Sequence, residues 1–471
     1  MKKNYEISEF GLIRSLEDYP DIDPLFISLK EIYLPKNHFD DLFDFIMQNQ
    51  EEKKDSERMF SIFYKKKKRQ IKTKNYVGVI ETFRGLTLEI LPKIFFDHQD
   101  GSYEAELINT KKIFLKMLSA LKNSPFLNIS SAHLKTSPNL PLLEIFIESY
   151  INEIKKIIRV GVKSQYVENQ ENLNFLKGKT LSSLNIKHNH SNKARFYCEF
   201  DEFSQNNVYN QLVKSTLLKL NRVSKSHFNR TNIFQLLHHF DSIDESKDFI
   251  ADLRKVNISN RLFTHYQNAI SLSEVFLANK SFTNFSGDSK NMAILFPMER
   301  IFEDYIGYLM KTYADGYEIK TQNKSYHLVS DHKNKEKFGL KPDIVATNTS
   351  NHNRIIFDAK WKVLDESKES SNYGISQSDM YQLYAYGKKY ALDASSIKKE
   401  PELVLLYPSN PNFKNSLEKF IYEEELTLNV IPFDLNKSLS KEDEKKEVIK
   451  ILETMTKFDS NDYQDNNQIA L

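Results

Sequence analysis

The chain has 471 residues, of which 28% are charged and 40% hydrophobic, and its formal net charge is +2. This length predicts two or three domains, and an aromatic content of 12% supplies enough apolar side chains for real cores, which excludes a disordered protein. Because the net charge is close to zero, bulk electrostatics provides no attraction to nucleic acid, and any such contact must use local basic surface.

The first part of the chain, residues 1–105, is predicted to be a β-rich domain. The stretch YVGVIETFRGLTLEILPKIF, which begins at Tyr76, has two β-type runs on either side of Phe83-Arg84-Gly85, where glycine permits the tight reversal of a hairpin. The basic run KKKKR, from Lys65 to Arg69, is interpreted as a solvated strand end or loop without a functional role.

Residues 106–285 are predicted to form a mainly helical middle region. The stretches LINTKKIFLKMLSALKN and LLEIFIESYINEIKKIIRVGV carry apolar residues at three- and four-residue spacing, as amphipathic helices require. Further helices are expected around 207–222, 231–239 and 262–278. A polar, glycine-containing segment, 280–291, then marks a predicted domain boundary.

Residues 286–436 are predicted to form a compact module. Its order is a helix, three strands, a second helix and two more strands, and this alternation predicts a small mixed sheet flanked by helices. The whole chain is therefore expected to have a mixed α/β, multidomain fold. The tail, 437–471, is rich in Lys, Glu, Asp and Asn and is expected to fray.

The lone cysteine, Cys198, excludes an internal disulfide framework and zinc sites built from cysteines, and is interpreted as a buried, unreactive thiol. The N-terminal residues form no continuous apolar run, and no later stretch approaches the length needed to cross a bilayer. We expect a cytoplasmic protein that makes no contact with a membrane.

Two apolar strands of the C-terminal module carry acidic residues. Asp343 lies in LKPDIVAT, where a carboxylate is costly unless its charge is compensated. In RIIFDAKWK, strand alternation places Asp358 and Lys360 on one face and Ala359 on the other. Carboxylates that converge in this way hold Mg²⁺ for phosphodiester hydrolysis, while a lysine orients or polarises the attacking water. The same acid-x-lysine spacing also arises by chance elsewhere in this lysine-rich chain, so the context of the two strands carries the argument.

Two flanking helices supply the other candidate residues. Gln382 and Tyr386 are four residues apart, so they share one helix face and can position a phosphate or a water. Glu303 borders the apolar stripe of the helix that begins the module and can complete the metal site, although an ordinary surface glutamate is the competing interpretation. Trp361 and Lys362 are interpreted as a packing residue and a contact to a backbone phosphate.

The sequence KGKT, from Lys177 to Thr180, does not form a phosphate-binding loop. The pattern G-x4-G-K-T requires a glycine at position 173, which is Leu173. If the protein belongs to an energy-driven machine, the nucleoside triphosphatase must be another chain.

Glu303, Pro342-Asp343, Asp358-Ala359-Lys360 and Gln382-x3-Tyr386, in this order, resemble the PD-(D/E)XK nuclease superfamily. More narrowly, the chain resembles the McrC family, because YVGVIETFRGLTLEILPKI, YVENQENLNFLKGK, FDEFSQNNVYNQLVKSTLLKL and ILFPMERIFEDYI match segments of that family. The resemblance implies a PD-(D/E)XK nuclease core in the C-terminal module. It also implies Asp343, Asp358 and Glu303 as ligands of Mg²⁺, and Lys360, Gln382 and Tyr386 as further catalytic residues.

The same resemblance implies the partners. McrC proteins supply the nuclease of a restriction complex whose other component is a hexameric AAA+ GTPase of the McrB type, and their substrate is double-stranded DNA. It implies that the N-terminal β-rich part docks on the GTPase and that cutting requires the complex. This sequence departs from the family in its long extension before Tyr76 and in its charged tail, which puts the docking surface in doubt.

Three hypotheses remain open on the sequence alone. The chain is the endonuclease subunit of a methylation-dependent, McrBC-like system that defends against foreign DNA. Alternatively, it is the nuclease of a multi-subunit, type II-like system that cuts an unmethylated site and is paired with a cognate methyltransferase. In the third, it is a non-catalytic activator of the GTPase.

Overall fold

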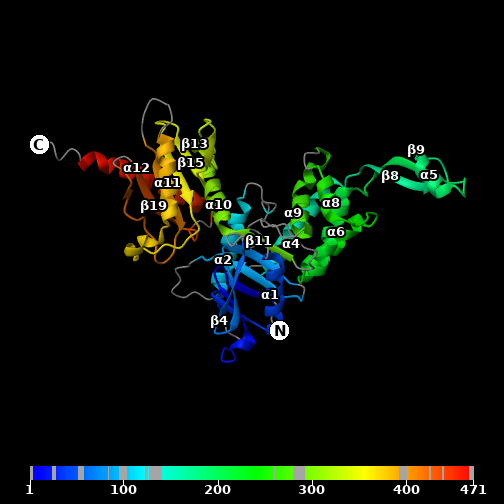
Figure 1. Cartoon of the computed structure of the whole chain (residues 1–471), viewed down its shortest axis with the longest axis horizontal. Coiled ribbons are helices and arrows are strands. Elements are labelled where there is room, and N and C mark those ends of the chain that lie inside the picture. The colour runs from blue at the N-terminus through cyan, green and yellow to red at the C-terminus, as the bar shows by residue number, and fades with distance from the viewer. Residues whose placement is uncertain are drawn as a thin grey trace.

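The computed structural model describes residues 4–23, 28–50, 58–82, 84–94, 103–121, 126, 140–257, 261–278, 292–391, 400–423, 426–437 and 440–465. The expected boundary at 280–291 and Phe83 of the expected turn lie outside these residues. Figure 1 shows an elongated molecule, with the N-terminal sheets in the centre, the C-terminal module at one side, and helices followed by a projecting arm at the other.

A four-stranded sheet of order β1-β7-β6-β11 forms the centre of the molecule. Its strands are β1 (Asn4–Ser8), β6 (Tyr76–Glu81), β7 (Thr87–Leu91) and β11 (Met292–Pro297). The β6–β7 hairpin is confirmed as predicted, and Gly85 adopts a φ of +84° at its turn. Strand β11, from the start of the expected C-terminal module, pairs antiparallel with β6, so it belongs to this sheet and not to the C-terminal one.

A second sheet, of order β3-β2-β5-β4, packs with helix α1 in the N-terminal part. Its elements are β2 (Leu12–Ser15), the 3-10 turn Leu16–Asp18, β3 (Glu31–Leu34), α1 (Lys36–Gln50), β4 (Phe60–Lys65) and β5 (Lys68–Thr73). Lys66 and Lys67 form the left-handed turn between β4 and β5, so the KKKKR run is a strand end and turn as expected.

The middle region contains the expected helices. They are α2 (Tyr103–Ser119), α4 (Leu142–Val160), α6 (Val208–Val223), α7 (His227–Leu237) and α9 (Gln267–Ala278), with 3-10 turns at His238–Phe240 and Arg261–Tyr266. A further short helix, α8 (Phe249–Lys255), was not predicted. Helix α4 buries Ile147, Tyr150, Ile154 and Ile157, whose spacing of three or four residues produces one continuous apolar face. Buried Glu89 of β7 connects this region to the central sheet: one oxygen pairs with Lys111 Nζ at 2.6 Å and the other accepts from Leu142 N at 2.6 Å.

An arm, residues 165–204, projects from the helices and was not anticipated from the sequence (Figure 1). It consists of β8 (Gln165–Leu173), β9 (Lys179–Thr180), α5 (Ser182–Asn189) and β10 (Phe196–Ser204), with strand order β8-β10-β9. Its small core includes the buried thiol of Cys198. The buried amide of Asn189 bonds to Asn172, Asn185 and the carbonyl of Arg195, which compensates for the few apolar contacts available to so thin an element.

The C-terminal module is built on a six-stranded mixed sheet of order β12-β15-β16-β17-β19-β18. Its strands are β12 (Tyr317–Thr321), β15 (Ile344–Asn348), β16 (Arg354–Ala359), β17 (Glu402–Pro408), β18 (Phe420–Ile421) and β19 (Thr427–Phe433). The helices are α10 (Met298–Tyr313) and α11 (Gln377–Ala391), with a 3-10 segment at Glu369–Gly374. A separate hairpin pairs β13 (Tyr326–Ser330) with β14 (Glu336–Leu340), where single longer strands were expected.

Alternation along the strands divides the core of this module between two helix layers. Ile355 and Phe357 of β16 belong to the core that contains α10, whereas Ile356 belongs to the core that contains Leu383 and Tyr386 of α11. The mixed α/β fold is therefore confirmed. Within the described residues, no helix is long and apolar enough to cross a membrane.

For residues 441–465, the expectation that the tail frays was wrong. Residues Lys441–Asp465 form helix α12, which packs on α10 and buries Val448, Ile451, Leu452 and Met455. Glu444 accepts bonds from Tyr305 and Tyr313 of α10, at 3.0 and 3.1 Å. Glu444 and Glu447 are also buried, whereas Lys441, Lys445 and Lys446 are exposed, so a polar composition concealed an amphipathic pattern.

Candidate active site

The strands β15 and β16 bring Asp343, Asp358 and Lys360 together, as the sequence predicted. Asp343 immediately precedes β15, and its Oδ2 accepts the backbone N–H of Ala359 at 2.9 Å, which extends the ladder between the two antiparallel strands. Lys360 Nζ lies 2.5 Å from Oδ2 of Asp358, and the Asp358 side chain is almost fully buried. The three side chains therefore face one another at the end of this strand pair.

Burial and mutual repulsion shape the ionisation of this cluster. Burial, together with the negative charges of Asp358 and Glu303, raises the pKa of Asp343 to about 8, against the opposing effect of the bond from Ala359. Burial alone would lower the pKa of Lys360, but attraction to Asp358 outweighs it and holds the pKa above its ordinary value. The ammonium of Lys360 thus compensates a concentration of negative charge that is expensive to bury.

Helix α10 directs Glu303 at the same cluster. Burial raises the pKa of Glu303, Lys360 opposes this rise, the neighbouring charge of Asp358 adds to it, and the resulting pKa is about 7. Ile301, Phe302 and Tyr305 on the same helix are buried, so packing of the apolar stripe orients Glu303 at its border. Glu303 is therefore close enough to Asp358 and Lys360 for its ionisation to depend on both.

Gln382 and Tyr386 meet on the face of α11 that turns toward the sheet. Gln382 Nε2 donates to Tyr386 Oη at 2.6 Å. Burial raises the pKa of Tyr386, the bond from Gln382 opposes the rise, and the charges of Asp358 and Asp343 add to it. The side chains of all six candidate residues are thus linked by contacts or by electrostatic interaction.

Two polar residues next to this cluster escaped sequence analysis. Gln322 donates from Nε2 to Oδ1 of Asp343 at 3.3 Å. Asp379, which is buried on α11, pairs with Lys362 Nζ at 2.7 Å, so Lys362 already has an anionic partner in the chain. Asp379 lies three residues before Gln382, and this helical spacing was the one available signal for it.

The cluster has the chemical character of a site for a hard divalent cation. All of its anionic donors are carboxylate oxygens, and Oδ1 of buried Asp358 has no hydrogen-bond partner among the described residues. However, no group of three or more His, Cys, Asp or Glu side chains in the described ranges is placed so that it could hold a metal ion as it stands. The residues fit Mg²⁺ by donor type and charge, with Lys360 supplying the compensating charge against Asp358.

Comparison with known proteins identifies the family. A search of the curated proteins gave no match. The refined half-complex from a tetradecameric assembly of Thermococcus gammatolerans McrB AAA+ hexamers with bound McrC contains a chain of similar fold, with 20% sequence identity and a TM-score of 0.62. The similarity covers 96% of this chain and 100% of that one.

A second similarity, to a chain of the cryo-EM structure of the Thermococcus gammatolerans McrBC complex, has 21% identity and a TM-score of 0.45. It covers 67% of this chain and 89% of that one. A family profile described as "McrBC 5-methylcytosine restriction system component" matches residues 71–408, which is more than half of the chain. The predicted resemblance is confirmed, and the chain belongs to the family of McrBC 5-methylcytosine restriction system components.

Proposed function

We propose that the chain is the Mg²⁺-dependent DNA endonuclease subunit of a McrBC-like restriction complex, with its active site in a PD-(D/E)XK core. The observation that carries the proposal is the buried cluster of Asp343, Asp358 and Lys360 at the end of β15 and β16. A structural protein has no need of two buried carboxylates and a third nearby whose charges repel one another, because such a cluster destabilises the fold.

Each residue has a distinct part in the proposed reaction. Asp343, Asp358 and Glu303 would hold Mg²⁺, which neutralises charge on the scissile phosphate and activates water. Lys360 orients the attacking water and stabilises the developing negative charge at the phosphate. Gln382 and Tyr386 form a hydrogen-bonded pair beside the cluster, where they position the phosphate or the water.

The proposed partner is a hexameric AAA+ GTPase of the McrB type. The chain has no phosphate-binding loop, because Leu173 stands where that motif requires glycine. The structure that this chain resembles over 96% of its length is described as an assembly of McrB AAA+ hexamers with bound McrC. A GTPase in a second chain accounts for both observations, and double-stranded DNA is the proposed substrate of the complex.

The arm adds a docking surface to the one expected in the N-terminal part. Phe175, Leu176 and Ile186 are each more than 60% exposed on it, so their apolar side chains are available to a partner. We assign this surface to the AAA+ hexamer because the arm projects away from the C-terminal module (Figure 1). A double variant, Phe175→Ser with Ile186→Ser, should fail to stimulate the partner GTPase while its melting temperature stays unchanged. Normal stimulation of the GTPase by this variant would instead indicate that the N-terminal sheets form the docking surface.

The central experiment is Asp358→Ala in the complex reconstituted with the product of an adjacent GTPase gene. Cutting of DNA in Mg²⁺ should be abolished, while stimulation of the GTPase stays in place. Asp315→Ala is the matched control, because this aspartate is exposed and pairs with Lys445 away from the cluster. The purified chain alone should cut negligibly. Unchanged cutting by Asp358→Ala would reject the site, and an intact complex that never cuts DNA would favour a non-catalytic activator.

Methylated and unmethylated DNA separate the remaining alternatives. The family description names 5-methylcytosine, which favours a system that requires methylation. Cleavage of methylated DNA only is therefore the expected result. Cleavage of unmethylated DNA, together with a methyltransferase gene next to this one, would instead support a site-specific system with a cognate methyltransferase.

A further inference from the structure

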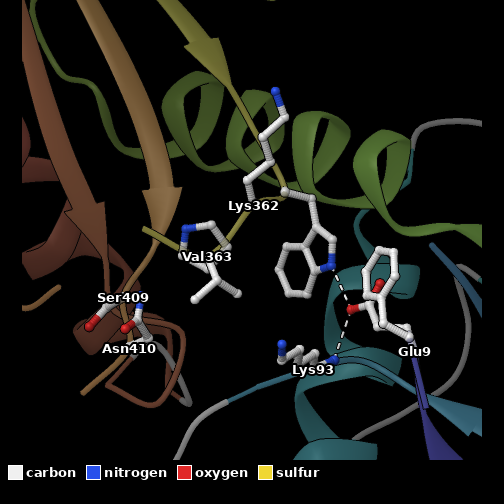
Figure 2. Close-up of a pocket in the computed structure, with 9 residues that line it drawn as sticks. Glu9, Lys93, Lys362, Val363, Ser409 and Asn410 are labelled. Carbon is white, nitrogen blue, oxygen red and sulfur yellow. Dashed lines mark hydrogen bonds between the residues drawn. The ribbon is translucent and has the colours of Figure 1, made fainter. Parts of the chain in front are cut away.

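A cavity of about 220 Å³ lies between the N-terminal part and the C-terminal module (Figure 2). One side is lined by Glu9, Phe10 and Lys93, which follow β1 and β7. The other is lined by Trp361 to Val363, which follow β16 and Lys360, and by Pro408 to Asn410 at the end of β17. The cavity therefore adjoins the segment that leaves the candidate active site.

The carboxylate of Glu9 joins the two sides of this cavity. Its Oε1 accepts from Trp361 Nε1 at 2.6 Å and from Lys93 N at 2.8 Å, as Figure 2 shows. Glu9 is only 1% exposed, and its Oε2 has no hydrogen-bond partner in the described part of the chain. Burial raises the pKa of Glu9, both hydrogen bonds oppose this rise, and the resulting pKa is about 7. The buried carboxylate of Glu9 thus connects two parts of the fold, because it accepts one bond from Lys93 and one from Trp361.

The turn that carries Glu9 is held firmly in place. Glu9 N donates to Leu91 O at 2.9 Å, and Gly11 N donates to Thr73 Oγ1 at 2.8 Å. Phe10 between them has a φ of +60°, a conformation that bulky residues rarely adopt. A rigid turn can fix the position of whatever its side chain binds.

Trp361 lies between two residues of the candidate site. Along the chain it follows Lys360 directly. In space, its ring packs against Phe302, with the ring centroids 5.3 Å apart, and Phe302 precedes Glu303 on α10. The indole is nearly buried, so its orientation constrains both the backbone at Lys360 and the adjacent turn of α10.

We propose that Glu9 is a positioning residue for the nuclease: it holds Trp361, and through Trp361 it sets the placement of Lys360 and Glu303. This inference rests on the proposed nuclease function. It makes the N-terminal sheets part of the cleavage machinery, because the contact between β1 and β7 on one side and the end of β16 on the other determines the geometry of the site. A movement of the N-terminal part in the complex would then change the geometry of the cluster, because the hydrogen bond between Glu9 and Trp361 connects the two.

The test uses the full chain with Glu9→Ala, Glu9→Gln and Trp361→Phe. Trp361 is the single tryptophan of the sequence, so intrinsic fluorescence of the isolated chain reports on this contact directly. Glu9→Ala should shift the emission maximum and increase quenching by acrylamide. Glu9→Gln should retain the wild-type spectrum, because its amide oxygen still accepts both N–H groups.

Cleavage by the reconstituted complex supplies the second measurement. Glu9→Ala and Trp361→Phe should each lower the rate at saturating DNA by about tenfold or more, as expected when a reacting group is misplaced by a fraction of an ångström. Glu9→Gln should cut at close to the wild-type rate, and Glu104→Ala, at an exposed position of α2, should have no effect. The double variant Glu9→Ala with Trp361→Phe should be no slower than either single one.

The outcomes separate the two proposals. If the wild-type complex cuts and Glu9→Ala cuts equally fast, the positioning role is rejected while the nuclease assignment stands. Equal losses in Glu9→Ala and Glu9→Gln would also reject it, because charge and not the hydrogen bond would then be responsible. If the wild-type complex cuts no DNA, the nuclease proposal fails, and the positioning proposal fails with it.

Discussion

Replacing Lys360 with methionine tests how the buried charges of the candidate site are balanced. Methionine keeps the length and apolar stem of the side chain but removes the ammonium that lies 2.5 Å from Oδ2 of Asp358. Asp358 would then be buried without a cationic partner, close to Glu303 and Asp343. The variant should therefore be less stable than the wild type when no metal is present.

The size of the loss follows from the burial of the pair. Removing one partner of a buried ion pair costs about 3–5 kcal/mol. The Lys360 side chain is 18% exposed, so water reaches its end and part of the cost is recovered. We expect a loss of about 3 kcal/mol in the free energy of unfolding, at the lower end of that range. Mg²⁺ should restore part of this loss, because a divalent cation replaces the missing positive charge.

Urea unfolding in EDTA and in Mg²⁺ measures both effects. Lys320→Met is the matched control: Lys320 pairs with Glu318 at 3.1 Å and both side chains are exposed, so losing this pair should cost no more than about 1 kcal/mol. Cutting by Lys360→Met in the complex should fall by about 100-fold or more. Equal losses of stability in the two variants, or a Mg²⁺ effect no larger in Lys360→Met than in the wild type, would refute this account of the site.

Three further variants or conditions test the fold and the cluster. Lys111→Met should cost about 3–5 kcal/mol of stability, because it leaves Glu89 buried and unpaired, and adding Glu89→Gln should restore part of it in the same urea assay. The pKa values of Asp343 and Glu303, about 8 and about 7, lie above those of the unfolded chain, so the metal-free protein should lose stability as the pH rises from about 4 to 8. The free energy of unfolding, measured at pH 5 and pH 8 in EDTA, tests this direction, and a higher value at pH 8 would contradict it. Gly78→Ala should destabilise by about 2 kcal/mol or more, because its Cβ would lie 2.0 Å from Ile294 O, whereas Gly85→Ala meets open space and should cost about 1 kcal/mol in thermal unfolding.

Local sequence patterns predicted the cluster well because its chemistry follows from strand geometry. The two-residue repeat of a strand is enough to place Asp358 and Lys360 on one face, and a four-residue step on α11 is enough to bring Gln382 to Tyr386. Whether Mg²⁺ binds there, and whether the core is of the PD-(D/E)XK type, stay predictions. Without a bound cation the carboxylates repel one another. The positions that they would take around a metal therefore cannot be predicted from these residues alone.

Contacts between residues far apart in the sequence could not be predicted from local patterns. The bond from Trp361 to Glu9 joins residues 352 positions apart, and neither local pattern suggests the other. Trp361 was interpreted as a packing residue, which its contact with Phe302 supports, but its N–H donor has a second role. Helix α12 was missed for a different reason: its apolar stripe is narrow, and the average composition of the tail hides it.

The pairing of β11 with β6 affects any attempt to dissect the molecule. A truncation that ends at 285 would remove β11 and expose the edge of β6, with the apolar side chains of Val77 and Val79 beside it. A nuclease fragment that begins at 286 would carry β11 as a strand without its sheet, fused directly to α10 and Glu303. Halves divided at this point should aggregate when expressed apart. Exchange of the nuclease between related proteins should succeed only when strand β11 stays with the N-terminal sheet that it completes.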